Sequence, residues 1–287
     1  MWEKNIYDLT PVENIGGIWF KRDDLFSPDG IHNGSKFRQL IWLFSRQSYP
    51  GVSSGAVTGS PQLPMVAACA RHYGMECVQF TGARKNMALA GEELGARTVL
   101  VNPGYGPNLN RKAALYAQEH GWLHVETNIT ESKDIEPFHA VGAEQVRNIP
   151  DHIRTLIIPA GSRNSATSIL YGLHKYPKRL DRIILMNIHP NLEKNEAWMR
   201  KRLAVCGIEK IAYELQTYDV FAGGYTDYSK LMPFRQDELL FHPRYEGKCW
   251  NYISDNVEKF APYLNAKTLF WIVGAEPVRA IRKARPK

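Results

Sequence analysis

Short apolar runs alternate with longer amphipathic segments along most of the chain. The apolar runs have the length of strands and predict strands at residues 17–21, 56–58, 76–80, 98–101, 155–158, 182–186, 210–214 and 268–273. Between them, apolar positions recur at helical spacing and predict helices at residues 36–46, 65–73, 87–94, 109–120, 140–147 and 166–174. This alternation is typical of an α/β fold with mostly parallel sheets.

Composition narrows the class of protein only slightly. The chain has 287 residues, 44% of them hydrophobic, which is enough for one large domain or two modest ones. No apolar stretch is long enough to span a bilayer and no signal region follows the N-terminus, so we expect a cytoplasmic protein with no membrane partner. The four cysteines form no CxxC pair and the histidines lack metal-ligand spacing, so we expect neither disulfides nor a metal site.

The charge is moderately basic, with a net charge of +7 from 36 basic and 29 acidic residues. An ordinary basic enzyme and a protein that binds nucleic acid both fit this balance. Part of the excess lies in a C-terminal tail that contains Arg279, Arg282, Lys283, Arg285 and Lys287. Such a tail is compatible with a polyanionic substrate.

Lys36 is the first candidate for chemistry. Residues 19–25 (WFKRDDL) read as a strand that ends in a charged turn, and Lys36 follows Gly34 and Ser35 at the start of a helix-like run. A lysine that is partly shielded near a helix N-terminus has a lowered pKa and can act as a nucleophile. The alternative is a solvated lysine at the start of a surface helix.

The same stretch resembles the lysine motif of fold-type II pyridoxal-phosphate enzymes, in particular the 1-aminocyclopropane-1-carboxylate deaminase and D-cysteine desulfhydrase group. Residues 20–25 and 34–40 carry the match, with Ser35 in place of the family's Asn and Gln39 in place of its second Lys. The resemblance implies a tryptophan synthase β-like fold of two α/β domains in a divergent member. Residues 45–150 would form the small domain. Residues 1–44 and 151–287 would form the large one, with pyridoxal 5′-phosphate in the cleft, and the chain would be a homodimer by analogy.

A second motif predicts a phosphate-binding loop. An apolar strand runs into a turn of small and polar residues and then a helix, and the turn consists of Gly161, Ser162, Arg163, Asn164 and Ser165. Backbone N–H groups at such a helix start favour an anion. The turn resembles the family's G-S-G-G-T loop, which holds the cofactor phosphate, but two glycines are replaced by Arg163 and Asn164. Asn tolerates left-handed backbone angles better than Arg, and Arg163 could pair with the phosphate charge. A plain strand–turn–helix connection is the alternative.

A third motif, residues 242–248 (HPRYEGK), resembles the family segment whose glutamate faces the pyridine nitrogen and whose tyrosine lies near the substrate. The resemblance gives these roles to Glu246 and Tyr245. A carboxylate at that nitrogen keeps the ring protonated and makes it a deep electron sink. Many relatives place a hydroxyl there instead, but the corresponding Val273 has none. The resemblance therefore implies deamination, lyase cleavage, decarboxylation or epimerisation through an external aldimine and a quinonoid. A surface turn is the alternative.

One family motif is missing. The family's Q-S-N-H segment, which contacts the substrate carboxylate, corresponds to residues 58–65, where Leu63, Pro64 and Met65 offer no side-chain donor. In a shifted alignment Ser60 or Gln62 would substitute. This departure argues against true aminocyclopropane-carboxylate deaminase or D-cysteine desulfhydrase activity. The loop that contains Tyr225 falls where relatives place a tyrosine near the cofactor, so Tyr225 is a further candidate substrate contact; an exposed turn is its alternative.

These motifs together predict a pyridoxal-phosphate-dependent lyase or deaminase that acts on an amino acid or an amino-acid-bearing substrate. Lys36, Tyr245 and Glu246 would be catalytic. One alternative keeps the cofactor but takes an amino-acid-modified nucleotide or DNA base, as in phage-type thymidine hypermodification. A further alternative is a degenerate protein that binds the cofactor without turnover.

Overall fold

The computed structural model describes the chain except residues 1, 3–4, 127–133, 226–229, 238 and 275–287. The described residues form two compact units, one within Gln39–Lys133 and the other within Trp2–Arg38 and Asp134–Lys287. The division falls inside helix α1 (Ser35–Ser45). The resemblance implied domain limits near residues 45 and 150, and the assignment of these units as functional domains stays a prediction.

The larger unit is built on a six-stranded sheet in the order β1-β2-β12-β7-β8-β9. β1 (Val12–Ile15) and β2 (Ile18–Arg22) pair antiparallel as a hairpin. All other neighbours pair parallel. These strands are β12 (Thr268–Ile272), β7 (Thr155–Ala160), β8 (Arg182–Asn187) and β9 (Glu214–Asp219). A separate two-stranded hairpin joins β10 (Arg235–Gln236) to β11 (Leu239–Leu240).

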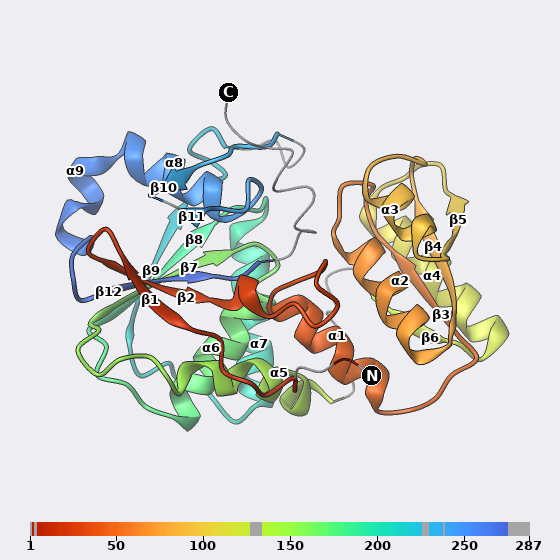
Figure 1. The fold of residues 1–287 in the computed structure, drawn as a ribbon, viewed down its shortest axis with the longest axis horizontal. Helices are drawn as coiled ribbons and strands as arrows, with labels where there is room; N and C mark the ends of the chain where they lie inside the picture. Colours follow the sequence, from red (N-terminus) through yellow and green to blue (C-terminus); the bar gives the residue numbers. More distant parts are fainter. Residues whose placement is uncertain (1, 3–4, 127–133, 226–229, 238, 275–287) are drawn as a thin grey trace. The chain divides into compact units, whose positions relative to one another are not determined.

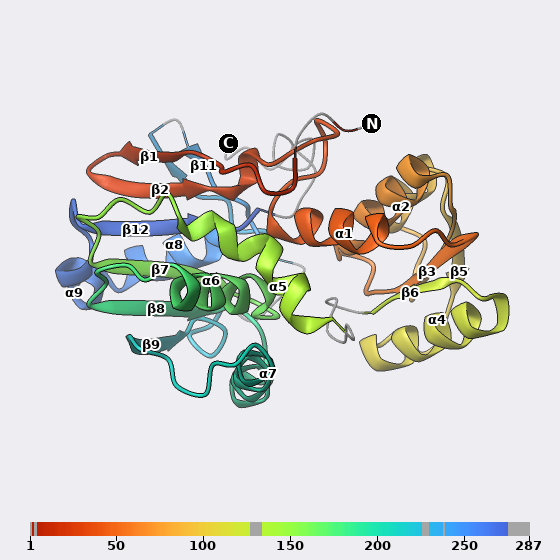
Figure 2. The same cartoon turned by 90° about the horizontal axis from the view of Figure 1, so that it is seen from below.

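Helices cover both faces of this sheet (Figures 1 and 2). One face carries α5 (Ile135–Ala143), α6 (Asn164–Lys175) and α7 (Leu192–Val205). The other carries α8 (Glu246–Asp255) and α9 (Val257–Phe260). Short 3-10 turns lie at Asp23–Leu25, Glu144–Val146 and Ala261–Tyr263. Because both faces are covered, the central strands read as continuous apolar runs.

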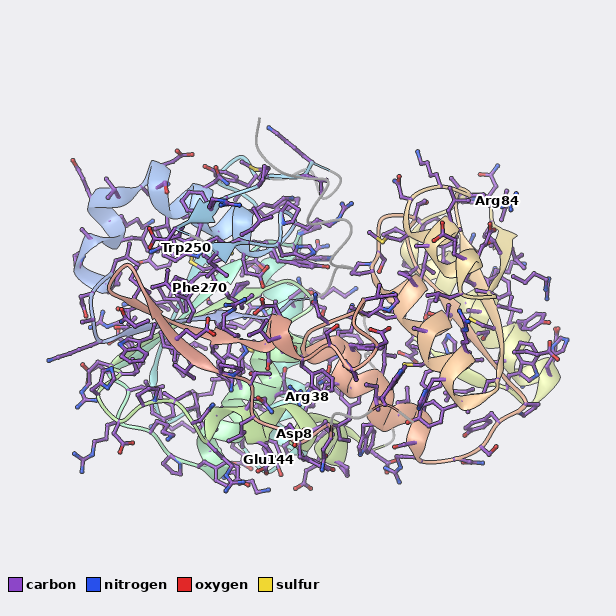
Figure 3. All side chains as sticks on the ribbon, in the orientation of Figure 1. Asp8, Arg38, Arg84, Glu144, Trp250 and Phe270 are labelled. Atoms are coloured by element: carbon purple, nitrogen blue, oxygen red, sulfur yellow. The ribbon has the colours of Figure 1, made fainter. Side chains whose placement is uncertain are left out.

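Successive residues of the central strands enter two different cores. Leu156 and Ile158 pack in the core beneath α5, α6 and α7, whereas Ile157 between them packs in the core beneath α8 and α9. On β12, Trp271 belongs to the first core and Phe270 to the second. Phe270 lies with its ring centroid 5.1 Å from that of Trp250 on α8, and both are labelled in Figure 3. This period of two is the one that strands impose.

The smaller unit has a parallel sheet in the order β5-β4-β3-β6. The strands are β3 (Gly51–Gly55), β4 (Glu76–Thr81), β5 (Arg97–Leu100) and β6 (Leu123–Val125). The helices are α2 (Gln62–Tyr73), α3 (Met87–Glu93) and α4 (Gly106–His120). α2 and α4 lie on opposite faces of this sheet, which Figure 2 shows nearly edge-on.

Two predicted strands are wrong. A strand was predicted at residues 56–58, but the structure has the strand β3 just before it, at Gly51–Gly55. The strand predicted at residues 210–214 begins only at Glu214, where β9 starts. Within the described residues, no helix is long and apolar enough to cross a membrane.

Candidate active site

Lys36 lies in the first turn of α1, whose start is fixed by the end of β12. Gly34 precedes the helix with φ 89°, and a Cβ there would lie 2.3 Å from the carbonyl oxygen of Val273. Ser35 N–H donates to the same oxygen at 3.1 Å. Glycine is therefore required at position 34 both by its backbone angle and by close packing. The result is that the helix of Lys36 begins directly against the carboxyl end of a central strand.

The Lys36 amine has the character expected of a Schiff-base lysine. The residue is half-buried, and among the described residues no hydrogen bond holds its Nζ. Burial lowers its pKa to about 8. Lys21, the other lysine of the motif, is also buried and its pKa is lowered to about 7 by burial. However, Lys21 Nζ donates to Thr10 O at 2.7 Å and to Asn148 Oδ1 at 2.8 Å, so it has a structural task.

The charged turn before α1 is a buried polar network. Asp23 accepts hydrogen bonds from Thr10 Oγ1 at 3.0 Å and from Trp271 Nε1 at 3.1 Å. Its Oδ1 lies 3.5 Å from Arg38 Nη2 in the first turns of α1. Both charged side chains are fully buried, and paired buried charges hold a fixed geometry. The network thus ties the turn and α1 to β12.

The predicted phosphate loop connects β7 to α6. Arg163 is the N-cap of α6 with φ 61° and ψ 11°, so the left-handed position falls on Arg163 and not on Asn164, which has the more tolerant side chain. For a residue with a Cβ this conformation costs about 1–2 kcal/mol. Thr167 donates to Arg163 O from both its backbone N–H and its hydroxyl, each at 2.8 Å. In general, the first backbone N–H groups of a helix have no partner within the helix, and such a helix start favours an anion.

The polar side chains of the loop point in different directions. Arg163 is fully buried, and within the described residues its three guanidinium nitrogens have no hydrogen-bond acceptor. Its nearest carboxylate oxygen is Glu196 Oε2 on α7, 4.0 Å from Nη1. Asn164 Oδ1 accepts from Arg202 Nη1 at 2.5 Å, so this amide faces α7 too. Pairing of Arg163 with the phosphate stays a prediction, and so does the role of Asn164 at the phosphate.

The lysine helix and the phosphate loop meet through two hydroxyl groups. Ser35 Oγ lies 2.6 Å from Ser165 Oγ, although the two residues are 130 positions apart. The phosphate loop also adjoins the third motif, because a Cβ on Gly161 would lie 3.9 Å from the ring of Tyr245. Ser162, between these contacts, is half-buried.

Glu246 is a fully buried carboxyl group with one oxygen unpaired. It begins α8, and its Oε1 accepts from the backbone N–H groups of Val273 at 2.8 Å and Gly274 at 3.2 Å. No described residue donates to Oε2. Burial raises the pKa of this carboxyl to about 8, against the opposing effect of the backbone hydrogen bonds. Val273, which lacks the hydroxyl of many relatives, contributes its backbone instead.

The three sequence motifs therefore converge in the larger unit. Ser35 contacts both β12 and Ser165, Gly161 adjoins Tyr245, and Glu246 binds the same end of β12 that receives Ser35. Bound pyridoxal phosphate fits the unpaired groups. The helix start and the hydroxyls suit its phosphate, the Lys36 amine suits its aldehyde, and Glu246 Oε2 suits its ring nitrogen.

Tyr245 and Tyr225 have different placements. Tyr245 is half-buried and stacks on His242 with ring centroids 4.6 Å apart, beside the phosphate loop. The Tyr225 hydroxyl donates to Asp255, the last residue of α8, and its ring contacts Tyr252. Because Glu246 begins that helix, Tyr225 is anchored about 14 Å from it along the axis. The role of Tyr225 as a substrate contact stays a prediction.

Ser60 and Gln62, the predicted substrate contacts, lie in the smaller unit at the start of α2. Ser60 Oγ accepts from Gln62 N–H at 3.3 Å. The Gln62 amide is fully buried and donates to Ser54 Oγ at 3.0 Å and to Glu126 O at 2.7 Å. The Gln62 side chain is therefore bonded within its own unit, and its role as a substrate contact stays a prediction. Ser60 stays a prediction, and the basic tail falls outside the described residues.

Known proteins resemble this chain along its full length. No family model matches it. The O-seryl-dTMP PLP-dependent decarboxylase of Salmonella phage ViI is 32% identical in an alignment that covers 100% of this chain and 86% of the phage protein. Among solved structures, a homologue of ACC deaminase superposes with a TM-score of 0.73 at 16% identity, covering 93% of this chain and 89% of that one. The processed form of threonine deaminase isoform 2 from Solanum lycopersicum has a TM-score of 0.64 at 14% identity, covering 97% and 88%. These likenesses confirm the expected fold.

Proposed function

Because the chain belongs to the fold-type II family of pyridoxal-phosphate-dependent enzymes, we propose that it decarboxylates an amino acid carried on a nucleotide, with O-seryl-dTMP as the first substrate to test. The observation that carries the proposal is the buried, unpaired Oε2 of Glu246. Support for the substrate comes from the name of the phage relative. The alternative of a lyase or deaminase acting on a free amino acid uses the same residues.

The larger unit supplies groups for each end of the cofactor. Lys36 would hold its aldehyde carbon, residues 161–165 its phosphate, and Glu246 its ring nitrogen. When bound, pyridoxal phosphate supplies an electron sink for the electron pair that remains at the substrate α-carbon after a bond is broken.

Glu246 sets the strength of that sink. With a pKa of about 8, the carboxyl holds a proton at neutral pH until a base is placed at Oε2. Glu246 would hold the ring nitrogen of the cofactor at Oε2 and would keep that nitrogen protonated. The two backbone N–H groups on Oε1 then stabilise the carboxylate.

Lys36 supplies the proton that completes a decarboxylation. The bond between the α-carbon and the carboxylate breaks, CO₂ leaves, and the electron pair stays at the α-carbon. Lys36 Nζ would donate a proton to that carbon. Its pKa of about 8 keeps the amine mostly protonated at pH 7, while the decrease from 10.5 makes it a better acid than an ordinary lysine.

The start of α2 departs from the family motif. The family's carboxylate contacts correspond here to Leu63, Pro64 and Met65, which offer no side-chain donor. Leu63 packs with Ala56 and Ala88.

The test offers the pyridoxal-phosphate-loaded protein three substrates: O-seryl-dTMP, DNA that contains the same modified base, and free serine. Mass spectrometry of the organic product and assays of CO₂ and ammonia separate the reactions. We expect CO₂ and the corresponding amine from a nucleotide-borne substrate, and loss of both with Lys36→Ala. Release of ammonia would instead establish a deaminase, and turnover of free serine alone would refute the nucleotide substrate. Bound cofactor without any product would favour the degenerate protein.

A further inference from the structure

Charged side chains gather at the end of β2, on the face of the sheet that carries Glu246. Arg22, the last residue of β2, has the same parity along the strand as Ile18 and Phe20, which pack in the core beneath α8 and α9. Glu13 on β1 is the register partner of Phe20 and therefore points to the same face. Because Glu246 begins α8, Arg22 and Glu13 lie on its side of the sheet.

Arg22 joins two carboxylates into one group, the β2 charge cluster of Glu13, Arg22 and Asp24. Its Nε and Nη2 donate to the two oxygens of Asp24 at 2.8, 3.0 and 3.3 Å, and its Nη1 donates to Glu13 Oε2 at 2.6 Å. Burial raises the pKa of Asp24, and the hydrogen bonds from Arg22 oppose this effect and favour the charged carboxylate. One cation and two anions give the cluster a net charge of −1.

The β2 charge cluster reaches Glu246 through the end of β12. Arg22 is the register partner of Ile272, the last residue of β12. The Cα of Asp24 lies 3.2 Å from the place of a Cβ on Gly274, and Gly274 N–H donates to Glu246 Oε1 at 3.2 Å. Burial is the main cause of the raised pKa of Glu246, and the charge of Asp24 raises it further.

Other titratable side chains lie on α8, on the segment before it and at the start of α1, namely Lys248, Cys249, His242, Arg244, Tyr245 and Lys36. Burial raises the pKa of the Cys249 thiol well above its usual value, so this group is uncharged. None of these side chains is a carboxylate. The anion that acts on Glu246 from the neighbouring strand is therefore Asp24.

We propose that Asp24 and Arg22 are positioning residues for the acid at Glu246: the β2 charge cluster places a net negative charge beside this carboxyl group and keeps its proton bound in the cofactor-free protein. The same negative charge favours a cation at the place where Glu246 would hold the ring nitrogen. The proposal rests on the role proposed for Glu246 and not on the nucleotide substrate. Because its test uses cofactor-free protein, a failed substrate assay leaves it standing.

The experiment follows the infrared band of the protonated Glu246 carboxyl group in cofactor-free protein as the pH is raised. The band is identified by its absence in Glu246→Gln, and its midpoint in the wild type should lie at about 8. We expect Asp24→Asn to lower the midpoint by about one pH unit, because a neighbouring anion is removed. Arg22→Met should raise it by about the same amount, because Asp24 then lacks its counter-charge. The control is Arg84→Met, which removes an ion pair with Glu92 in the smaller unit and should leave the midpoint unchanged.

The two substitutions shift the midpoint in opposite directions only if the charges act on Glu246. A cluster that merely holds β2 in place would move the midpoint in the same direction in both variants, or in neither, and either result would overturn the proposal. If Arg22→Met does not fold, Arg22→Gln takes its place and is judged by the same upward shift. Asp24→Glu, which keeps the charge, should titrate like the wild type, and a midpoint as low as that of Asp24→Asn would refute the role of the charge.

Discussion

Glu246→Gln should change how the stability of the cofactor-free protein depends on pH. Glutamine keeps an oxygen for the N–H groups of Val273 and Gly274 but cannot ionise. In the wild type, burial raises the pKa of Glu246 from 4.5 to about 8. The folded protein therefore binds this proton more tightly than the unfolded chain does. This preference destabilises the fold progressively as the pH rises from 4.5 towards 8.

The size of the effect follows from the shift. A difference of about 3.5 pKa units corresponds to about 5 kcal/mol at 1.36 kcal/mol per unit, reached only above the folded pKa. Between pH 6 and pH 8 the wild type should lose about 2 kcal/mol of unfolding free energy relative to the variant. The new amide group leaves buried N–H donors without partners, which costs about 1–3 kcal/mol, but this cost does not vary with pH.

The assay is urea unfolding of the cofactor-free protein at pH 6 and pH 8, followed by tryptophan fluorescence, to which the buried Trp250 and Trp271 of the larger unit contribute. At each pH, the unfolding free energy of the variant is subtracted from that of the wild type. The prediction concerns how much this difference changes between pH 6 and pH 8. Glu119→Gln, on the exposed face of α4, is the matched control and should follow the wild type. If the difference in unfolding free energy between wild type and Glu246→Gln were the same at pH 6 and pH 8, the raised pKa would be refuted. The account of Glu246 as proton donor to the ring nitrogen would be refuted with it.

Three further substitutions test the lysine, the glycine before it and the arginine behind the phosphate loop. Lys36→Ala should prevent covalent attachment of the cofactor after borohydride treatment, seen by mass spectrometry, and should slow turnover by at least about 10²-fold; retained attachment would contradict the assignment. Gly34→Ala should destabilise the protein, measured by melting temperature, by more than Gly74→Ala, because both have positive φ but only Gly34 has a backbone atom, Val273 O after β12, within 3 Å of the added Cβ. Arg202→Met should weaken pyridoxal phosphate binding, measured by titration into cofactor-free protein, about threefold to tenfold by freeing Asn164, and unchanged affinity would show that the loop holds itself.

The central strands could be predicted because strands buried on both faces consist almost entirely of apolar residues. β7 and β8 are apolar on both faces, and the prediction found both. β3 has the sequence GVSSG, which is a poor strand by propensity. Its glycines are needed by its neighbours: a Cβ on Gly51 would lie 2.4 Å from the Trp122 ring, and one on Gly55 would lie 2.3 Å from Leu109 O in α4. Close packing against residues distant in the sequence therefore determines this strand. The local sequence pattern does not predict it. β9 is an edge strand with few fully buried positions, so its apolar signal is weak.

The candidate site shows the same division between local and distant information. Lys36, the loop at residues 161–165 and Glu246 each belong to a contiguous motif that could be recognised alone. The contact of Ser35 with Ser165 spans 130 positions, and the bond from Arg202 to Asn164 spans 38. Both depend on which helix starts meet in space. The sequence analysis considered only the side chain of Val273, which has no hydroxyl. In the structure, its backbone N–H donates to Glu246 and its carbonyl oxygen accepts from Ser35.

The chemistry of the polar groups in the candidate site indicates which kind of ligand would bind there. Arg163 and the Ser35–Ser165 pair lie at or beside the start of α6, and these groups favour an anion. Glu246 Oε2 favours a base that can accept a proton. Lys36, between Ser35 and the rest of α1, has a lowered pKa and calls for an electrophilic carbon. Arg163 and Glu246 Oε2 destabilise the cofactor-free fold, because buried polar groups without partners are costly. A single molecule with a phosphate, a pyridine nitrogen and an aldehyde would offer partners to these groups and to Lys36. The cofactor should consequently stabilise the protein far more than a ligand that meets only one of these groups, because binding to the folded state alone adds to its free energy of unfolding.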